Sequence, residues 1–165
     1  MKKHLVIFIS IFLFIFVTAA AENEAQIAES IIDITNNLEW SANGPRAGEK
    51  VILGVVGESS VTGELEKLAS SASVEIRIKA FTDDMSDCHV VYTPTTDLKN
   101  LAKVLKQAAK AKLVTISSAK DFARYGVMIN LMADGSKLNF EINKMVLDDA
   151  GVKLDSKILK KATII

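Results

Sequence analysis

The sequence contains little cysteine, little histidine and no surplus of charge of either sign. Its 165 residues include a single cysteine, Cys88, and only two histidines. One thiol cannot close an internal disulfide, so apolar packing must hold the fold together. Lys plus Arg and Asp plus Glu both number 20, which is far from the basic excess of a nucleic-acid-binding protein. We therefore expect no nucleic-acid partner.

Long hydrophobic runs are also absent, except at the N-terminus. There, two lysines and His4 precede an uncharged apolar stretch, residues 5–17, which leads to three alanines at 19–21. A positive start, an apolar core of about 7 to 15 residues and small residues before the cleavage site make up a secretory signal peptide, whereas a membrane-spanning helix needs about 20 apolar residues. The sequence predicts a signal peptide over residues 1–21. Residues 22–165 have the length of one domain, which we expect to work outside the cytoplasm as a soluble protein.

Helical periodicity alternates with short apolar runs along these residues. Helices are predicted over 24–39, 61–71, 97–110 and 144–151, and strands over 51–56, 74–79, 88–92, 113–116 and within 158–165. Asp97 is expected to cap the third helix. Asp134 and Gly135 separate two alternating runs, 127–133 and 137–143, which predicts a hairpin. This order predicts an α/β fold, a single three-layer domain with a mixed, mostly parallel sheet ending in a β-hairpin.

Cys88 and His89 are the obvious candidates for catalysis, because an imidazole can hold a thiol as a reactive thiolate. Adjacent residues on a strand point to opposite faces, so the two side chains are expected to diverge. No other histidine remains after residue 21 to complete a dyad or a zinc site. We therefore expect Cys88 to be a buried, inert thiol.

Three weaker patterns could indicate ligands. Asp83, Asp84, Asp87 and His89 are dense enough to consider a calcium or other hard-cation site, but their spacing matches no known ligand loop, and a solvated acidic loop is the favoured interpretation. Three glycines, Gly54, Gly57 and Gly63, lie around a strand-to-helix connection, where backbone amides can bind an anion at a helix start. Neither a P-loop nor a GxGxxG spacing is present, which favours turn formation. The lysines of 97–110 could meet anionic lipid, but they lie opposite an apolar stripe, as on any solvated helix, and a solvated face is the favoured interpretation. We expect neither a metal nor a cofactor.

The C-terminal third carries a pattern of several short motifs. They are Phe122-Ala123, Gly126-Val127-Met128-Ile129, Leu138 to Asn143, Ala150-Gly151-Val152 and Ser156 to Ile164, with Leu38-Glu39-Trp40 and Cys88 to Tyr92 upstream. In this order they resemble the YfiR-like family of periplasmic proteins. The chain departs from the family at Asp121 and Tyr125, which replace glycines, at Ser41, which replaces a proline, and in the cysteines that form disulfides in some relatives.

The resemblance implies a non-enzymatic periplasmic regulator without catalytic residues. Its best-known relatives bind the periplasmic sensory domain of an inner-membrane diguanylate cyclase and repress cyclic di-GMP production and biofilm formation. An outer-membrane lipoprotein with a peptidoglycan-binding domain can sequester such a repressor. The implied partners of this chain are therefore such a cyclase or another membrane sensor, and such a lipoprotein; a homodimer and an intermolecular disulfide through Cys88 stay open.

Aromatic and Arg side chains dominate protein interfaces, which makes Trp40, Phe122, Arg124 and Tyr125 the candidate partner-binding residues. Core packing is the alternative for Trp40 and the favoured interpretation for Phe122. A second hypothesis is a small-ligand sensor whose pocket lies at the carboxyl ends of the central strands. A hydrolase that uses Cys88 and His89 is the third.

Overall fold

The computed structural model describes residues 22–41, 44–134 and 137–165. The predicted signal peptide and Gly135 of the predicted hairpin turn lie outside these residues. Among the described helices, none combines the length and the hydropathy needed to cross a membrane.

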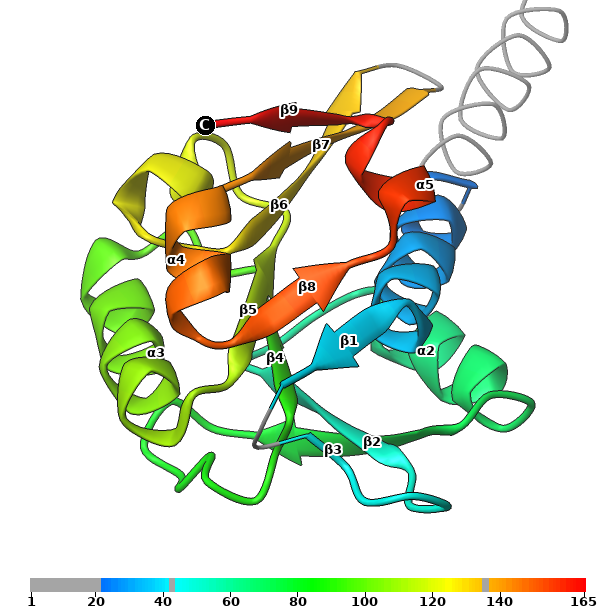
Figure 1. The fold of residues 1–165 in the computed structure, drawn as a ribbon. Helices are drawn as coiled ribbons and strands as arrows, with labels where there is room; N and C mark the ends of the chain where they lie inside the picture. The colour runs from blue at the N-terminus through cyan, green and yellow to red at the C-terminus, as the bar shows by residue number, and fades with distance from the viewer. Residues whose placement is uncertain (1–21, 42–43, 135–136) are drawn as a thin grey trace, which may run out of the picture.

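Seven strands form the main sheet, in the order β3-β2-β4-β5-β6-β7-β9 (Figure 1). Their bounds are β2 Val51–Val56, β3 Val74–Lys79, β4 Val90–Thr93, β5 Val114–Ser117, β6 Ile129–Asp134, β7 Lys137–Ile142 and β9 Ala162–Ile164. All neighbours are parallel except β6 and β7, which form an antiparallel pair. The predicted α/β fold class with a mixed, mostly parallel sheet is confirmed, and β9 adds a parallel strand beyond the hairpin.

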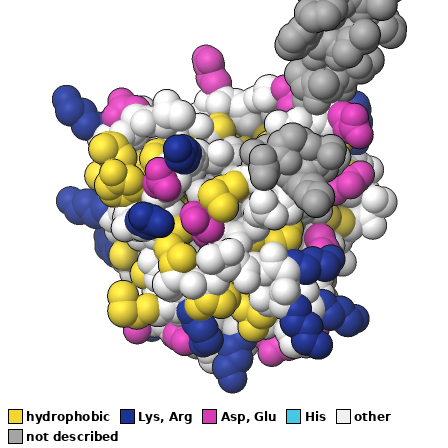
Figure 2. Space-filling model, turned by 90° about the horizontal axis from the view of Figure 1, so that it is seen from above, with side chains coloured by type: hydrophobic (Ala, Val, Ile, Leu, Met, Phe, Trp, Pro, Cys, Tyr) yellow, Lys and Arg dark blue, Asp and Glu magenta, His cyan; other side chains and the backbone are white. Residues whose placement is uncertain are grey.

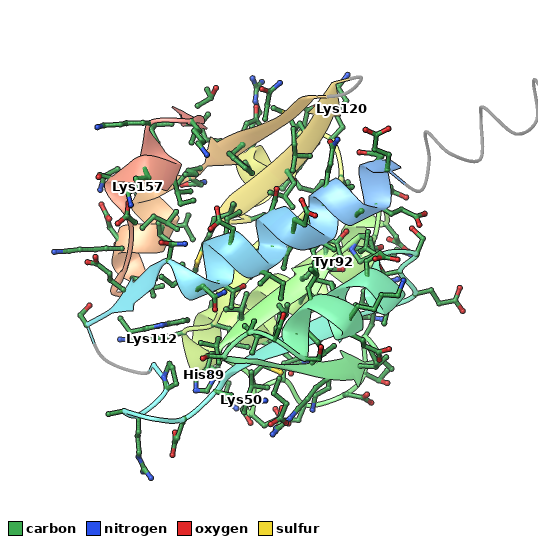
Figure 3. All side chains as sticks on the ribbon, turned by 90° about the vertical axis from the view of Figure 1, so that its right-hand side faces the viewer. Lys50, His89, Tyr92, Lys112, Lys120 and Lys157 are labelled. Carbon is green, nitrogen blue, oxygen red and sulfur yellow. The ribbon has the colours of Figure 1, made fainter. Side chains whose placement is uncertain are left out.

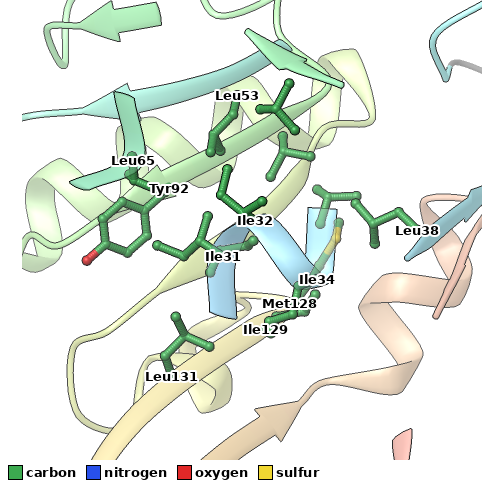
Figure 4. Close-up of a cluster of buried hydrophobic side chains, with 14 of the residues drawn as sticks. Ile31, Ile32, Ile34, Leu38, Leu53, Leu65, Tyr92, Met128, Ile129 and Leu131 are labelled. Atoms are coloured by element: carbon green, nitrogen blue, oxygen red, sulfur yellow. The ribbon is translucent and has the colours of Figure 1, made fainter. Parts of the chain in front are cut away.

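Helices cover both faces of this sheet. The N-terminal helix (22–36), α2 (Thr62–Ala69), α4 (Lys144–Asp149) and α5 (Ser156–Leu159) lie on one face, and α3 (Leu98–Ala111) with the 3-10 helix η1 (Phe122–Tyr125) lies on the other. Ile31 of the N-terminal helix packs into the largest buried cluster with Leu53 and Ile129 of the sheet (Figure 4). Val104 of α3 packs against Val91 on the opposite face.

The prediction of a helix over 24–39 is wrong at its C-terminal end. The helix ends at residue 36, and Leu38–Trp40 forms a strand, β1, that pairs antiparallel with β8 (Val152–Leu154) in a second, two-stranded sheet. Ser41 extends this pairing, because its backbone N–H donates to the carbonyl of Gly151 at 3.0 Å. A proline at position 41 has no N–H to make that bond.

The order of the strands places a topological switch point between β2 and β4. From β2 the chain passes through α2 to β3 on one side, and from β4 it passes through α3 to β5 on the other side. Because α2 and α3 cover opposite faces, the loops that follow β2 and β4 diverge at the carboxyl ends of these strands. Crevices at this position are where open α/β sheets bind ligands.

Candidate functional site

A groove of about 940 Å³ opens at the carboxyl ends of β2, β3 and β4. Its walls are the loop after β2 with Gly57, Glu58 and Ser59, the end of β3 from Ile78 to Phe81, and the loop before α3 from Pro94 to Thr96, together with Thr62 at the start of α2. Its lining combines apolar side chains, hydroxyl groups and two charged residues, Glu58 and Lys79. The groove can therefore take a molecule with both an apolar and a polar part.

Phe81 and Gly57 shape one wall of the groove. Gly57 has a φ of 91°, and a Cβ at this position would lie 2.6 Å from Cζ of Phe81. Only glycine fits both the backbone conformation and the close approach of the ring. The backbone N–H of Gly57 donates to the carbonyl of Lys79 at 2.9 Å, which ties the loop after β2 to the end of β3.

An ion-pair network joins two residues of β3 to Asp87 in the loop before β4. Nζ of Lys79 lies 2.8 Å from Oδ1 of Asp87, and Nη1 of Arg77 lies 2.6 Å from Oδ2 of the same carboxylate. The hydrogen bond from Lys79 lowers the pKa of Asp87 to about 2. The same bond raises the pKa of Lys79, so the ammonium group is held in its charged form beside Asp87.

Buried hydroxyl groups fix the carboxyl ends of the neighbouring strands. Tyr92 is almost fully buried, and its hydroxyl lies 2.8 Å from Oγ of Ser118. Burial raises the pKa of Tyr92. Thr93 donates to the carbonyl of Val56 at 3.2 Å, and Ser117 donates to the carbonyl of Thr93 at 2.8 Å. These bonds link β2, β4 and β5 at the level of the groove.

The candidate partner-binding residues fall on two elements. Phe122, Arg124 and Tyr125 all belong to η1, whereas Trp40 belongs to β1 and packs half-buried against the largest core cluster. Phe122 is 4% exposed, and Tyr125 is 57% exposed. The two rings meet edge to face, with centroids 6.1 Å apart. Phe122 thus packs in the core and supports Tyr125, which lies at the surface beside the exposed Arg124.

Backbone conformation holds η1 in place at both ends. Asp121 before it has a φ of 65°, and Gly126 after it has a φ of 103°. Asp is one of the few residues other than glycine that adopts this left-handed region. The replacement of a family glycine by Asp121 is therefore compatible with the same turn.

Cys88 and His89 face different surroundings. Cys88 packs among Met85 and Val91 in the cluster under α3, and burial raises the pKa of its thiol to about 11. His89 accepts a hydrogen bond at Nδ1 from the backbone N–H of Ile52 and packs against Trp40. Figure 3 shows His89 and Tyr92 toward opposite ends of β4. A thiol with a raised pKa is a poor nucleophile at neutral pH.

The acidic loop before β4 uses its carboxylates within the protein. Asp83 accepts from the backbone N–H of Ala80, and Asp84 accepts from both the N–H and the hydroxyl of Ser86. Within the residues that the structure describes, no three His, Cys, Asp or Glu side chains are grouped as metal ligands would be.

No sequence pattern identified most residues of the groove as pocket residues. The general expectation that a pocket lies at the carboxyl ends of the central strands places it correctly, but Phe81 and Thr95 meet there only because β3 and β4 flank β2. The one usable local signal is the pair of hydroxyl-rich stretches that follow β2 and β4, at 59–62 and 93–96. Such stretches are also common in ordinary loops.

Two solved structures share this fold at low sequence identity. A chain from Streptococcus pneumonia, described as the ABC domain in complex with L-Trp, matches with a TM-score of 0.64 and 15% identity over 86% of this chain and 60% of that one. A conserved domain protein from Vibrio cholerae O1 biovar El Tor matches with a TM-score of 0.62 and 16% identity over 86% of this chain and 59% of that one. The present chain thus spans about three fifths of the length of either protein. At this identity the likeness shows the fold alone.

No curated protein matches the chain in sequence. A family model described as YfiR/HmsC-like matches residues 25–163, which includes both the groove and η1.

Proposed function

The chain belongs to the YfiR/HmsC-like family, whose members are periplasmic regulators of diguanylate cyclases, and we propose that it acts by binding the periplasmic sensory domain of an inner-membrane diguanylate cyclase. In this proposal binding represses the cyclase, which lowers cyclic di-GMP and biofilm formation. Residues 1–21 serve as a cleaved signal peptide, and residues 22–165 form the exported domain. An outer-membrane lipoprotein that binds peptidoglycan is a second partner, which releases the cyclase by sequestering the repressor.

The observation that carries this proposal is the family match over residues 25–163. The chemistry of the chain agrees with a role in binding. Its one thiol is buried with a pKa raised to about 11, and the imidazole next to it accepts a backbone hydrogen bond. Neither group is available for nucleophilic attack in this arrangement.

We assign the cyclase contact to the surface formed by Arg124 and Tyr125 on η1. Tyr125 is exposed, and its ring packs edge to face against the buried ring of Phe122. A tyrosine held in this way gives a large contact area at little cost in conformational entropy. An exposed arginine beside it adds hydrogen-bond donors, and this pair of residue types is enriched among the residues that dominate binding energy. Trp40 is left as a second candidate contact on β1.

Capture of the partner tests this assignment. Chemical crosslinking in intact cells, followed by purification of the protein from solubilised inner membrane, should recover a diguanylate cyclase. The Tyr125→Ala and Arg124→Ala variants should recover it at least about tenfold less well, as expected for residues that contribute more than about 1.4 kcal/mol to binding. Lys110→Ala is the matched control and should leave recovery unchanged. It removes an exposed cation that lies on the same face of the sheet, at the C-terminal end of α3. Recovery of no signalling protein of the inner membrane, or equal recovery by all variants, would overturn the assignment.

The groove favours a second candidate function, a sensor of a small periplasmic molecule. It lies at the carboxyl ends of β2, β3 and β4, where this type of sheet binds ligands. Native mass spectrometry of gently purified protein tests this function. A bound mass that disappears in a Thr96→Trp variant, which fills the groove, would support it, and a bare protein mass in both samples would count against it.

A further inference from the structure

A row of polar side chains crosses five neighbouring strands of the main sheet. The strand register places one member from each strand beside the next, in the order Thr93, Ser117, Asn130, Glu141 and Thr163. The residues next to them in sequence, such as Ile116, Ile129 and Ile142, belong to the cluster under the N-terminal helix. Because successive residues of a strand point to opposite faces, the polar row lies on the side of the sheet that carries α3 and η1.

The members at either end of the row are satisfied. Thr93 donates to the carbonyl of Val56 at 3.2 Å. Ser117 donates to the carbonyl of Thr93 at 2.8 Å and accepts from the backbone N–H of Ala119 at 3.2 Å. Thr163 is exposed, so its hydroxyl can bond to water. These three residues therefore have partners for their polar groups.

The two middle members, Asn130 and Glu141, lack partners. Asn130 is fully buried, and Glu141 is 9% exposed. In the described part of the structure, Oδ1 and Nδ2 of Asn130 and Oε2 of Glu141 make no hydrogen bond. None of the ion pairs found among the described residues includes Glu141. Buried polar groups without a partner are rare in folded proteins, and a site for an ion or a ligand is one of their recognised causes.

Asn130 and Glu141 stand side by side. The backbone N–H of Asn143 donates to the carbonyl of Met128 at 2.9 Å, so these two residues form a hydrogen-bonded pair of β6 and β7. Such pairs alternate along antiparallel strands, and Asn130 with Glu141 is the next one. Their Cβ atoms are therefore about 5.5 Å apart. Although the two side chains are neighbours, no hydrogen bond joins them, so both keep acceptor atoms for a third group.

The row reaches solvent on the side of β7 and β9. Asn139, which shares a face of β7 with Glu141, is exposed, and so is Thr163 beside Glu141 on β9. Figure 1 shows β7 and β9 at the edge of the sheet, away from α3. Figure 2 looks down on this side of the molecule, where cationic and acidic side chains are interspersed. A group that approaches from this edge meets Glu141 first and Asn130 behind it.

The chemistry of the pair selects a guanidinium group. Removal of a carboxylate from water is strongly unfavourable unless an opposite charge and hydrogen bonds replace the water. A guanidinium group supplies both, because its parallel N–H donors form a planar fork that fits two adjacent acceptors. A calcium ion would need more oxygen ligands than these two side chains offer. A neutral ligand would leave the charge of Glu141 unpaired.

We propose that Glu141 and Asn130 form a binding site for a guanidinium group, which enters from the edge of β7 and β9. The carboxylate of Glu141 pairs with its charge, and Oδ1 of Asn130 accepts a further N–H. The group belongs either to a free guanidino compound such as arginine or to an arginine side chain of a docked protein. The site does not depend on the proposed repression of a cyclase. Without its ligand the pair costs stability, as is common for residues that are kept for binding.

Titration with L-arginine tests this site. L-citrulline, in which a neutral urea replaces the guanidinium group, is the matched control compound. In NMR spectra of the purified protein, arginine should shift amide signals of β6 and β7 saturably, with a dissociation constant of about 1 mM, as expected for one small charged group. Citrulline should not. Glu141→Gln should weaken the binding of arginine at least about tenfold, whereas Glu39→Gln, which changes an exposed glutamate of β1, should not.

Three results of this titration would overturn the proposal. They are the absence of saturable shifts with arginine, equal binding of citrulline, and equal binding of arginine by Glu141→Gln. Each would show that the charge of Glu141 does not recognise a guanidinium group.

Thermal unfolding separates a binding role of Glu141 from a structural one. Glu141→Gln keeps the shape of the side chain and removes an unpaired buried charge, so its Tm without ligand should equal or exceed that of the parent protein. A Tm lower by more than about 5 °C would show that the carboxylate already has a stabilising partner within the chain. That result would also overturn the proposal.

Capture of the partner distinguishes the two sources of the guanidinium group. If it belongs to a docked protein, Glu141→Gln should lower the recovery of that protein in the cellular crosslinking experiment at least about tenfold. If it belongs to a free compound, recovery should stay unchanged while the binding of arginine is lost. Should the parent protein capture no cyclase, the proposed function would fail, and the arginine titration would still decide the site.

Discussion

The backbone N–H of Ile52 donates a hydrogen bond to Nδ1 of His89, at 2.9 Å. An imidazole nitrogen accepts a hydrogen bond only while it carries no proton, so this bond requires neutral His89. Burial lowers the pKa of His89 below its ordinary value of 6.5. Because the bond joins the second residue of β2 to the residue before β4, protonation of His89 opposes the pairing of these two strands.

Acidification should therefore destabilise the protein through His89. The pKa of His89 is lower in the folded than in the unfolded chain, so the unfolded chain binds the proton more readily. The contribution of neutral His89 to stability is complete above pH 6.5 and is lost as the pH falls through the lower, folded pKa. Thermal unfolding between about pH 7.5 and about pH 5 should show a falling Tm. His89→Gln keeps an acceptor that does not titrate and should flatten this dependence; an unchanged pH slope would contradict the role of His89.

Asp87 should stabilise the protein at neutral pH and stop doing so in acid. Its folded pKa of about 2 lies below the model-compound value of 3.8, so the stabilisation is present above pH 3.8 and is lost as the pH falls toward about 2. Asp87→Asn should lower the free energy of unfolding at pH 7 by about 1 kcal/mol, a modest value because this carboxylate is partly exposed. Glu64→Gln, which breaks the exposed pair with Lys67, is the control and should change it by less than about 0.5 kcal/mol. Equal effects in both variants would show that the network adds nothing beyond a surface pair.

Gly54 and Cys88 should be energetically coupled. A Cβ on Gly54 would lie 2.8 Å from Sγ of Cys88, and both residues lie in the tightly packed layer under α3. Gly54→Ala should cost about 1–3 kcal/mol of unfolding free energy. In a Cys88→Ala background the sulfur is absent, so the same substitution should cost less, by about 1 kcal/mol or more in a double-mutant cycle. Additive effects would mean that the neighbouring backbone, and not the sulfur, limits the space at Gly54.

Substitution of the two aromatic residues of η1 should affect stability to very different extents. Phe122→Ala removes a side chain that is 4% exposed and should destabilise the fold by about 3–5 kcal/mol. Tyr125→Ala removes an exposed side chain and should change stability by less than about 1 kcal/mol. Chemical denaturation followed by circular dichroism measures both. A strongly destabilised Tyr125→Ala variant would show that Tyr125 belongs to the core and would withdraw it from the docking surface.

The parallel half of the sheet was predictable because local signals and packing agree there. The run Val51–Val56 is apolar and β-branched, and it becomes β2, which has neighbours on both sides and helices on both faces. Asp97 was identified as a helix cap, and it accepts a hydrogen bond from the N–H of Lys99 at 2.7 Å. In both cases the residues that decide the structure lie within a few positions of one another.

The sequence was not sufficient to predict the elements whose structure depends on residues far apart in the chain. Leu38 continues the helical spacing of Ile31 and Ile34, yet it lies in β1, because its partner strand is β8 near the other end of the chain. Periodicity cannot distinguish a fourth helical turn from a short strand that buries the same residue. The residues of the groove could not be predicted for the same reason. Its walls come from three strands whose spatial order, β3-β2-β4, is not their order in the sequence.

The level of cyclic di-GMP in living cells tests the central claim most directly. Cells that lack this protein should contain more cyclic di-GMP than the parent strain, and expression of the 165-residue sequence should restore the lower level. Expression of Tyr125→Ala at the same abundance should fail to restore it. Equal levels of cyclic di-GMP in the parent and the deletion strain would contradict the proposal that this chain represses a diguanylate cyclase.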